Sequence, residues 1–236
     1  MSTPAPSPPQ PPPPLIASLV ESGLNENAAR ILIAAARLFG QKGYSATSVR
    51  EIVQEADVTN PMLYYYFESK EGVFHRLLDF VVEALHQAIE DAIAQHEHVR
   101  DRLDAIAHTF FDGVKIAPEL VRFVYAVLFG PVQSRPGADI VAMQQKTHGL
   151  LHKVFEAGVA RGELLPHPGQ STHFLGDQFM AMVNNQMMIA FGILEFSCDC
   201  SEPEQLLNEY IGSGSRERLL NFFFNGAGTL ATQETP

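Results

Sequence analysis

Three consecutive tyrosines, Tyr64, Tyr65 and Tyr66, have the most distinctive chemistry in this sequence. A phenolic hydroxyl can donate to a phosphate oxygen, and its ring can pack on a sugar or on the thymine methyl group. The alternative role is an aromatic stripe in a hydrophobic core. Successive residues of a helix point about 100° apart, so three adjacent rings cannot all enter one core. The block therefore favours a surface that contacts DNA.

Two short helices are expected to position this block. Ser48 and Glu51 have the spacing of a capping box, which fixes the start of the first helix. Thr59 is a second N-cap, and Pro61 falls in the first turn of a helix predicted over 59–67, where its missing amide hydrogen matters little. Two helices joined by a turn of about 3–4 residues indicate a helix-turn-helix, whose second helix lies in the major groove.

The second helix is expected to have two unlike faces. Leu63 and Phe67 are four residues apart and can share the face that packs on the core. The other side is left with Asn60, Pro61, Met62, Tyr64 and Tyr65. We expect this second set to face the DNA.

The segment around these helices resembles the DNA-binding head of the TetR family of bacterial transcriptional regulators. The resemblance rests on Phe39, Gly43, Tyr44, the run Ala46-Thr47-Ser48, the run Arg50-Glu51-Ile52, Val58, the block from Leu63 to Phe67 and the run Ser69-Lys70-Glu71. It implies a homodimer with two such heads on a palindromic operator. It also implies a larger helical domain in which a small molecule shifts the spacing between the heads.

The family pattern assigns roles to individual residues of the head. It makes Thr47 and Ser48 contacts to the DNA backbone, and Thr59, Tyr65 and Lys70 contacts to phosphates. The expected contacts to base edges or groove walls are Asn60, Met62 and Tyr64, and the DNA surface also includes Arg50 and Pro61. Many relatives have Lys followed by Gly or Ala where this chain has Asn60-Pro61. The change removes a cation and an amide donor, so it affects the operator sequence more than the docking mode.

The helical period extends through the whole chain and predicts an all-α fold. A three-helix head is expected over residues 25–75, and a long helix from Ser69 through Ile93 joins it to a larger ligand-binding and dimerisation domain over 76–228. Further helices are indicated near 100–114, 118–129, 139–161, 170–192 and 215–225. Residues 1–24 are expected to form a disordered arm because eight of the first fourteen are Pro, and 229–236 a flexible tail.

Charge is distributed unevenly along the chain. The net charge of −11 would repel DNA, but residues 30–80 are neutral overall and residues 81–236 carry −9. Repulsion from the acidic part is screened within about 8 Å at physiological salt, so DNA binding by the head is not excluded. No Lys or Arg precedes Arg30, and no apolar run is long enough for a signal peptide or a membrane span. We expect a cytoplasmic protein without a membrane partner.

Apolar residues of the larger domain are expected to line a cavity for a small apolar ligand, with ordinary core packing as the alternative. The set is Phe110, Phe111, Phe123, Val127, Met143, Phe155, Met180, Val183, Asn184 and Met187. Met side chains adapt to varied ligand shapes, and a buried Asn needs a partner. The family places the last two long helices in a four-helix bundle across the dimer axis. The resemblance therefore assigns the dimer seam to Phe179, Leu219, Leu220, Phe222 and Phe223.

Metal or catalytic chemistry is the alternative class of function. His148 and His152 are four residues apart, and Cys198 and Cys200 form a close pair, so either pair could bind a metal in a metal-dependent sensor or a small-molecule enzyme with a vestigial head. Solvated histidines and free thiols are the more ordinary interpretation. No nucleophile-base pair, phosphate-binding Gly-rich loop or HExxH stretch is present. We expect no metal, no cofactor and no catalysis.

Overall fold

The computed structural model describes residues 14–21, 23–166, 169–196 and 203–226. Within these ranges the chain forms α-helices and one short 3-10 turn, with no strand, which confirms the all-α prediction. The chain divides into two compact units. We call Met1–Asp79 with Glu119–Gly137 the head unit, and Phe80–Pro118 with Ala138–Pro236 the body unit.

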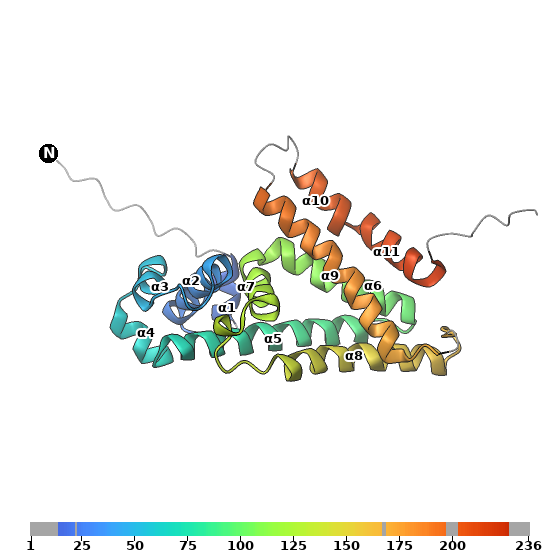
Figure 1. Cartoon of the computed structure of the whole chain (residues 1–236), viewed down its shortest axis with the longest axis horizontal. Helices are drawn as coiled ribbons and strands as arrows, with labels where there is room; N and C mark the ends of the chain where they lie inside the picture. Colours follow the sequence, from blue (N-terminus) through green and yellow to red (C-terminus); the bar gives the residue numbers. More distant parts are fainter. Residues whose placement is uncertain (1–13, 22, 167–168, 197–202, 227–236) are drawn as a thin grey trace, which may run out of the picture. The chain divides into compact units, whose positions relative to one another are not determined.

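The head unit contains the predicted three helices and two further segments (Figure 1). Its elements are α1 (Pro14–Glu21), α2 (Glu26–Lys42), α3 (Val49–Glu55), α4 (Asn60–Phe67), the first part of α5 (Lys70–Ala94), nearly all of α7 (Pro118–Phe129) and the 3-10 turn η1 (Val132–Ser134). Asn25 caps α2 by accepting from the amide of Asn27 at 2.9 Å. Gly43 ends α2 with a φ of 82°, a conformation that glycine adopts without strain.

Helix α1 lies inside the range that was predicted as a disordered arm. Pro14 occupies its first position, where the missing amide hydrogen has no partner to lose. Ile16 and Leu19 are three residues apart and both are buried, Leu19 to 1% exposure. The proline content of residues 1–24 led to the prediction of a disordered arm, but the apolar pair Ile16 and Leu19 gives a helix one face to bury.

An aromatic cluster holds the head unit together. The rings of Phe39 and Phe74 lie 5.9 Å apart, and each also contacts Tyr44 and Phe123, with centroids 5.3 to 6.1 Å apart. Phe123 comes from α7, which the sequence assigned to the larger domain. Its place in this cluster explains why residues 119–137 belong to the head unit.

The body unit is a bundle around α9. Its elements are the rest of α5, α6 (Val99–Ile116), α8 (Ile140–Ala160), α9 (Thr172–Phe196), α10 (Pro203–Ile211) and α11 (Ser213–Asn225). In Figure 1, α10 and α11 run along one side of α9. The sequence did not predict α10. Among the described residues, no helix is both long and apolar enough to span a bilayer.

Candidate nucleic-acid interface

The start of α3 is fixed by the capping box that the sequence predicts. The Ser48 hydroxyl oxygen accepts from the amide of Glu51, while the Glu51 carboxylate accepts from the Ser48 amide at 2.8 Å. Lys42 also donates to this carboxylate. The hydrogen bond from Lys42, followed by those from Ser48, lowers the pKa of Glu51 to about 2. The first turn of the helix-turn-helix is therefore tied to the end of α2.

The turn between α3 and α4 ends at Thr59, whose side chain makes no capping hydrogen bond to α4. The chain reverses at Asp57, whose φ is 53°, and the Val58 amide donates to the Val53 carbonyl at 3.0 Å. Thr59 is the N-cap by position, but its side chain makes no capping hydrogen bond. Because Thr59 is exposed, its hydroxyl can reach a group outside the protein.

Helix α4 has the two faces that the sequence predicts. Leu63 and Phe67 are buried, whereas Tyr64 is 50% and Tyr65 80% exposed. Tyr66 is half-buried and donates its hydroxyl to Asn25 at 2.8 Å. Asn60 and Pro61 are also exposed and Met62 is half-buried. The three tyrosines therefore have different surroundings, and only two of them lie on the outward face.

Thr47 and Lys70 are placed differently from the DNA contacts expected of them. Thr47 is 2% exposed, and its hydroxyl donates to the Gly43 carbonyl at 2.9 Å. The Lys70 ammonium donates to the carbonyls of Tyr44 at 3.0 Å and Thr47 at 2.8 Å. Both side chains are occupied within the protein. Spacing alone did not reveal this, because the accepting carbonyls of Lys70 lie more than twenty residues away in sequence.

The helix-turn-helix segment is similar to that of known regulatory proteins. A family model described as bacterial regulatory proteins, tetR family, matches residues 31–77. The HTH-type transcriptional repressor Rv3405c of Mycobacterium tuberculosis is 30% identical over 139 residues, covering 55% of this chain and 71% of that protein. The chain belongs to the TetR family. The predicted helix-turn-helix is thereby confirmed.

Other TetR relatives match over shorter parts of their length. The HTH-type transcriptional activator FasR of Mycolicibacterium smegmatis is 31% identical over 101 residues, which cover 43% of this chain and 46% of FasR. The match to the regulator YttP of Bacillus subtilis covers 47% of that protein. The chain thus spans about half the length of these two curated relatives.

Solved structures with the TetR fold match most of the chain. The regulator FadR from Bacillus subtilis, solved with stearoyl-CoA, has a TM-score of 0.64 at 15% identity and covers 84% of this chain and 98% of that one. AibR, solved with isovaleryl coenzyme A and operator DNA, has a TM-score of 0.62 at 18% identity, with the same coverage. At these identities the likeness is one of fold.

The residues expected to line a ligand cavity fall into two groups. In the body unit, Phe111, Phe155, Met180, Val183 and Met187 are buried, while Phe110, Met143 and Asn184 are partly exposed. Phe123 and Val127 lie on α7 in the head unit, where Phe123 packs on Phe39 and Phe74. Phe123 therefore packs within the head unit, and Val127 is buried on the same helix.

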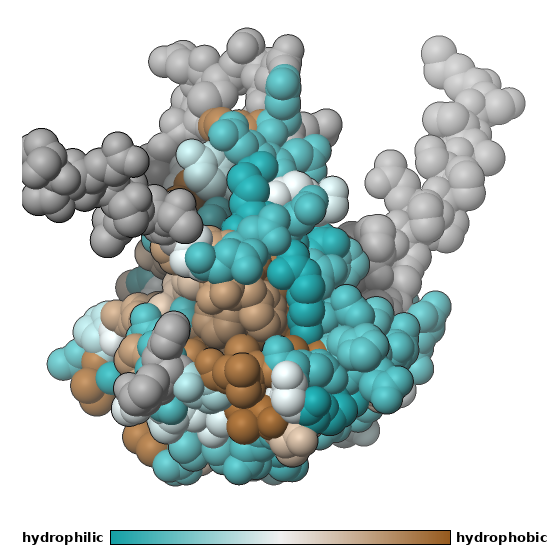
Figure 2. All heavy atoms as spheres, turned by 90° about the vertical axis from the view of Figure 1, so that its right-hand side faces the viewer, coloured by the Kyte–Doolittle hydropathy of each residue, from teal (hydrophilic) through white to brown (hydrophobic). Residues whose placement is uncertain are grey.

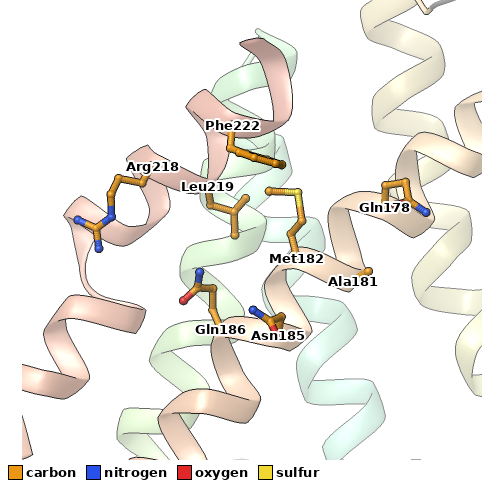
Figure 3. Close-up of a pocket in the computed structure, with 8 residues that line it drawn as sticks. All are labelled: Gln178, Ala181, Met182, Asn185, Gln186, Arg218, Leu219 and Phe222. Carbon is orange, nitrogen blue, oxygen red and sulfur yellow. The ribbon is translucent and has the colours of Figure 1, made fainter. Parts of the chain in front are cut away.

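The residues expected in the dimer seam are also divided. Phe179 is fully buried with its ring 5.6 Å from that of Phe223, and Leu220 is buried as well, so these side chains pack inside one protomer. Leu219, which is as buried as Leu220, and the exposed Phe222 line a groove of about 460 Å³ between α9 and α11. The Phe222 and Met182 side chains point toward each other there (Figure 3).

An exposed stripe on α9 was missed by the sequence analysis of the seam. We call this set the α9 stripe: Phe174, Gln178, Ala181, Asn185 and Met188, all exposed. Their spacing alternates between four and three residues, the period of a helix that packs against another helix. That spacing was readable in the sequence, but the many apolar neighbours on this helix obscured it.

Both histidines of the metal alternative already have partners in the structure. His148 lies 2.8 Å from Asp177, and His152 contacts Thr172 at 2.9 Å while stacking on His173 with centroids 3.7 Å apart. Among the described residues, no group of three or more His, Cys, Asp or Glu side chains is placed to hold a metal ion. Cys198 and Cys200 lie outside the described residues.

Proposed function

We propose that the chain is a homodimeric transcriptional repressor that binds a palindromic operator and is released by a ligand with an apolar acyl chain. The observation that carries this proposal is the division of α4, which buries Leu63 and Phe67 and turns Tyr64 and Tyr65 outward. When a recognition helix enters a major groove, exposed tyrosines on it can contact phosphates, sugars and base edges. Family membership and the AibR structure with operator DNA support the same function.

The DNA surface that we propose follows from exposure. It consists of Ser48, Arg50, Thr59, Asn60, Pro61, Met62, Tyr64 and Tyr65. Tyr65 and Thr59 can donate hydroxyls to phosphates, and Asn60 and Tyr64 can reach base edges. Arg50 is the one cation of this set. Because affinity falls with salt in proportion to the number of phosphates neutralised, we expect a shallow salt dependence.

The groove and the α9 stripe support the homodimer. A second copy that placed its own α9 and α11 against these helices would cover the exposed Phe222 and Met188 side chains. Figure 2 shows apolar residues gathered near the middle of one face, with polar residues beside and below them.

The ligand class that we propose is a coenzyme A thioester of an acyl chain. The buried inner side of α9 presents Met180, Val183 and Met187 to the core, opposite the exposed stripe. Flexible Met side chains can rearrange around an acyl chain. FadR with stearoyl-CoA and AibR with isovaleryl coenzyme A are structural neighbours that hold such compounds.

Release of operator DNA by acyl-CoA tests this function. Fluorescence anisotropy of a labelled operator duplex would be followed while acyl-CoA of increasing chain length is added, with free coenzyme A as the matched control. We expect release at micromolar acyl-CoA and none with free coenzyme A. The apolar chain would bind the DNA-free conformation of the dimer more tightly than the DNA-bound conformation, and free coenzyme A lacks this chain. Equal effects of both compounds, or no effect of either, would contradict the proposed ligand class.

A further inference from the structure

Lys70 joins the two ends of the helix-turn-helix. The role that we infer for it in operator binding rests on the proposed function. Thr47 directly precedes Ser48, the N-cap of α3, and Lys70 is the first residue of α5, three positions beyond the last residue of α4. The ammonium of Lys70 donates to the Thr47 carbonyl at 2.8 Å and to the Tyr44 carbonyl at 3.0 Å. The segment from Thr47 to Lys70 is therefore closed into a ring by one side chain.

The loop that receives this ammonium is also held by local hydrogen bonds and by the Ser45 hydroxyl, which donates to the Gln133 carbonyl at 2.9 Å. The Gly43 amide donates to the Phe39 carbonyl at 3.0 Å, and the Thr47 amide donates to the Tyr44 carbonyl at 3.2 Å. The Tyr44 ring lies beneath the ammonium, with Nζ 4.1 Å from its centroid, and packs on Phe39 and Phe74. Lys70 thus connects the loop before α3 to the aromatic cluster of the head unit.

The far end of the ring is equally tight. The Ser69 amide donates to the Phe67 carbonyl at 2.7 Å, and the Gly72 amide donates to the Ser69 hydroxyl oxygen at 2.9 Å. The start of α5 is therefore fixed against the end of α4. A cation anchored here can transmit the position of one end of the helix-turn-helix to the other.

The surroundings of Lys70 disfavour a role in neutralising phosphate. Two of its three N–H donors are used by carbonyls, and the side chain is partly buried. Burial lowers the pKa of its ammonium. Moving Nζ out to a phosphate would leave both carbonyls without this donor.

We propose that Lys70 is a positioning residue, which sets the angle between α3 and α4 by clamping the Tyr44 to Thr47 loop and does not itself neutralise a phosphate. Its contribution to operator affinity is then geometric. A phosphate contact and a clamp both weaken binding when removed, but they differ in salt dependence.

The test compares operator affinity of Lys70→Met with the unaltered protein at several salt concentrations. Met keeps the aliphatic stem and removes the donor. We expect about 10-fold weaker binding from the lost charge-assisted hydrogen bonds. The slope of log K, the operator association constant, against log salt concentration should stay unchanged. Loss of a phosphate contact would instead reduce the magnitude of this negative slope by about one. Lys153→Met, which removes the same charge from an exposed position on α8, should leave both quantities unchanged.

A second variant keeps the proposal testable if Lys70→Met does not fold. Tyr44→Leu retains the charge of Lys70 and the loop carbonyls but removes the ring beneath the ammonium. We expect Tyr44→Leu to bind operator more weakly, with an unchanged slope of log K against log salt. The double variant Lys70→Met with Tyr44→Leu should lose less affinity than the product of the two single losses. A slope reduced by about one in Lys70→Met, unaltered affinity in either variant, or fully independent effects would overturn the clamp. Absence of operator binding by the unaltered protein would instead defeat the proposed function itself.

Discussion

At the residue scale, the three adjacent tyrosines have two kinds of surroundings. Tyr66 is tied to Asn25, whereas Tyr64 and Tyr65 project outward. The sequence predicted that Tyr64 and Tyr65 face outward, because helical geometry separates neighbouring side chains, but it gave no position for Tyr66. It did not predict the burial of Thr47 or the two carbonyl partners of Lys70, since backbone acceptors leave no pattern in the sequence.

Tyr65 provides the first prediction. Tyr65→Ala should weaken operator binding by about 10-fold, as expected when a phosphate hydrogen bond and ring packing are both lost. Its melting temperature should stay close to that of the unaltered protein, because the side chain is 80% exposed. Tyr66→Phe is the matched control and should bind operator normally while losing some stability. Equal operator affinity of Tyr65→Ala and the unaltered protein would remove Tyr65 from the interface.

Glu51 provides a prediction about pH. Its pKa in the folded protein is about 2, below the ordinary value of 4.5, because Lys42 and then Ser48 donate to its carboxylate. A depressed folded pKa contributes stability that is fully present above pH 4.5 and is lost as the pH falls toward about 2. Glu51→Gln should therefore melt below the unaltered protein at pH 7, with a difference that shrinks between pH 4.5 and 2.

Lys42→Met is the companion variant for this titration. Removing the largest cause of the shift raises the pKa of Glu51 toward its ordinary value, so the acid-induced loss of stability should be smaller and should be complete at a higher pH. A melting difference between Glu51→Gln and the unaltered protein that is the same at every pH would contradict the capping role.

At the element scale, the corner between α4 and α5 depends on a glycine. A Cβ on Gly72 would lie 2.0 Å from the Phe67 carbonyl oxygen, which belongs to the backbone and cannot move aside easily. Gly72→Ala should destabilise the protein by about 1–3 kcal/mol despite the better helix propensity of Ala. Gly149→Ala on α8 is the control.

The control should change stability in the opposite direction. A Cβ on Gly149 meets nothing within 4 Å, so Ala there should stabilise the helix by about 0.5–1 kcal/mol. Thermal unfolding of both variants measures the difference. Equal stability of Gly72→Ala and Gly149→Ala would contradict the close contact between Gly72 at the start of α5 and the Phe67 carbonyl at the end of α4.

The helices themselves were largely predictable, but their grouping was not. Caps and the helical period located α2 to α9 and α11 within a few residues. The placement of α7 in the head unit depends on Phe123 meeting Phe39 and Phe74, a contact between residues about fifty or more apart in sequence. Helices α1 and α10 were missed because they are short and begin at Pro14 and Pro203, which composition assigns to loops.

At the scale of the whole molecule, the proposed dimerisation through α9 and α11 would bring two heads together on one operator. Phe222→Arg places a charge in the groove and should weaken the dimer by at least about 30-fold, as for the loss of an interface hot spot. Analytical ultracentrifugation measures this. Phe129→Arg, which alters an exposed Phe of the head unit, should leave the dimer intact. A dimer unaffected by Phe222→Arg would place the interface elsewhere.

The whole-molecule function was predictable only as far as the head's motif extends. The match to residues 31–77 carries the family, and the body follows from the fold. The two proposed faces of α9, one toward a ligand and one toward a second copy, rest on the burial of Met180 and Met187 and the exposure of Asn185 and Met188. Hydrophobicity alone did not separate them, because both faces contain methionine.

The most direct test of the central proposal is selection of bound duplexes from a random DNA pool by the purified full chain. A homodimer with two helix-turn-helix heads should enrich a palindrome whose half-site centres lie about 34–36 Å apart, one turn of the double helix. Tyr65→Ala should enrich the same sequence less strongly. Failure of the unaltered protein to enrich any sequence, or enrichment of an isolated half-site alone, would contradict the dimeric DNA-binding function.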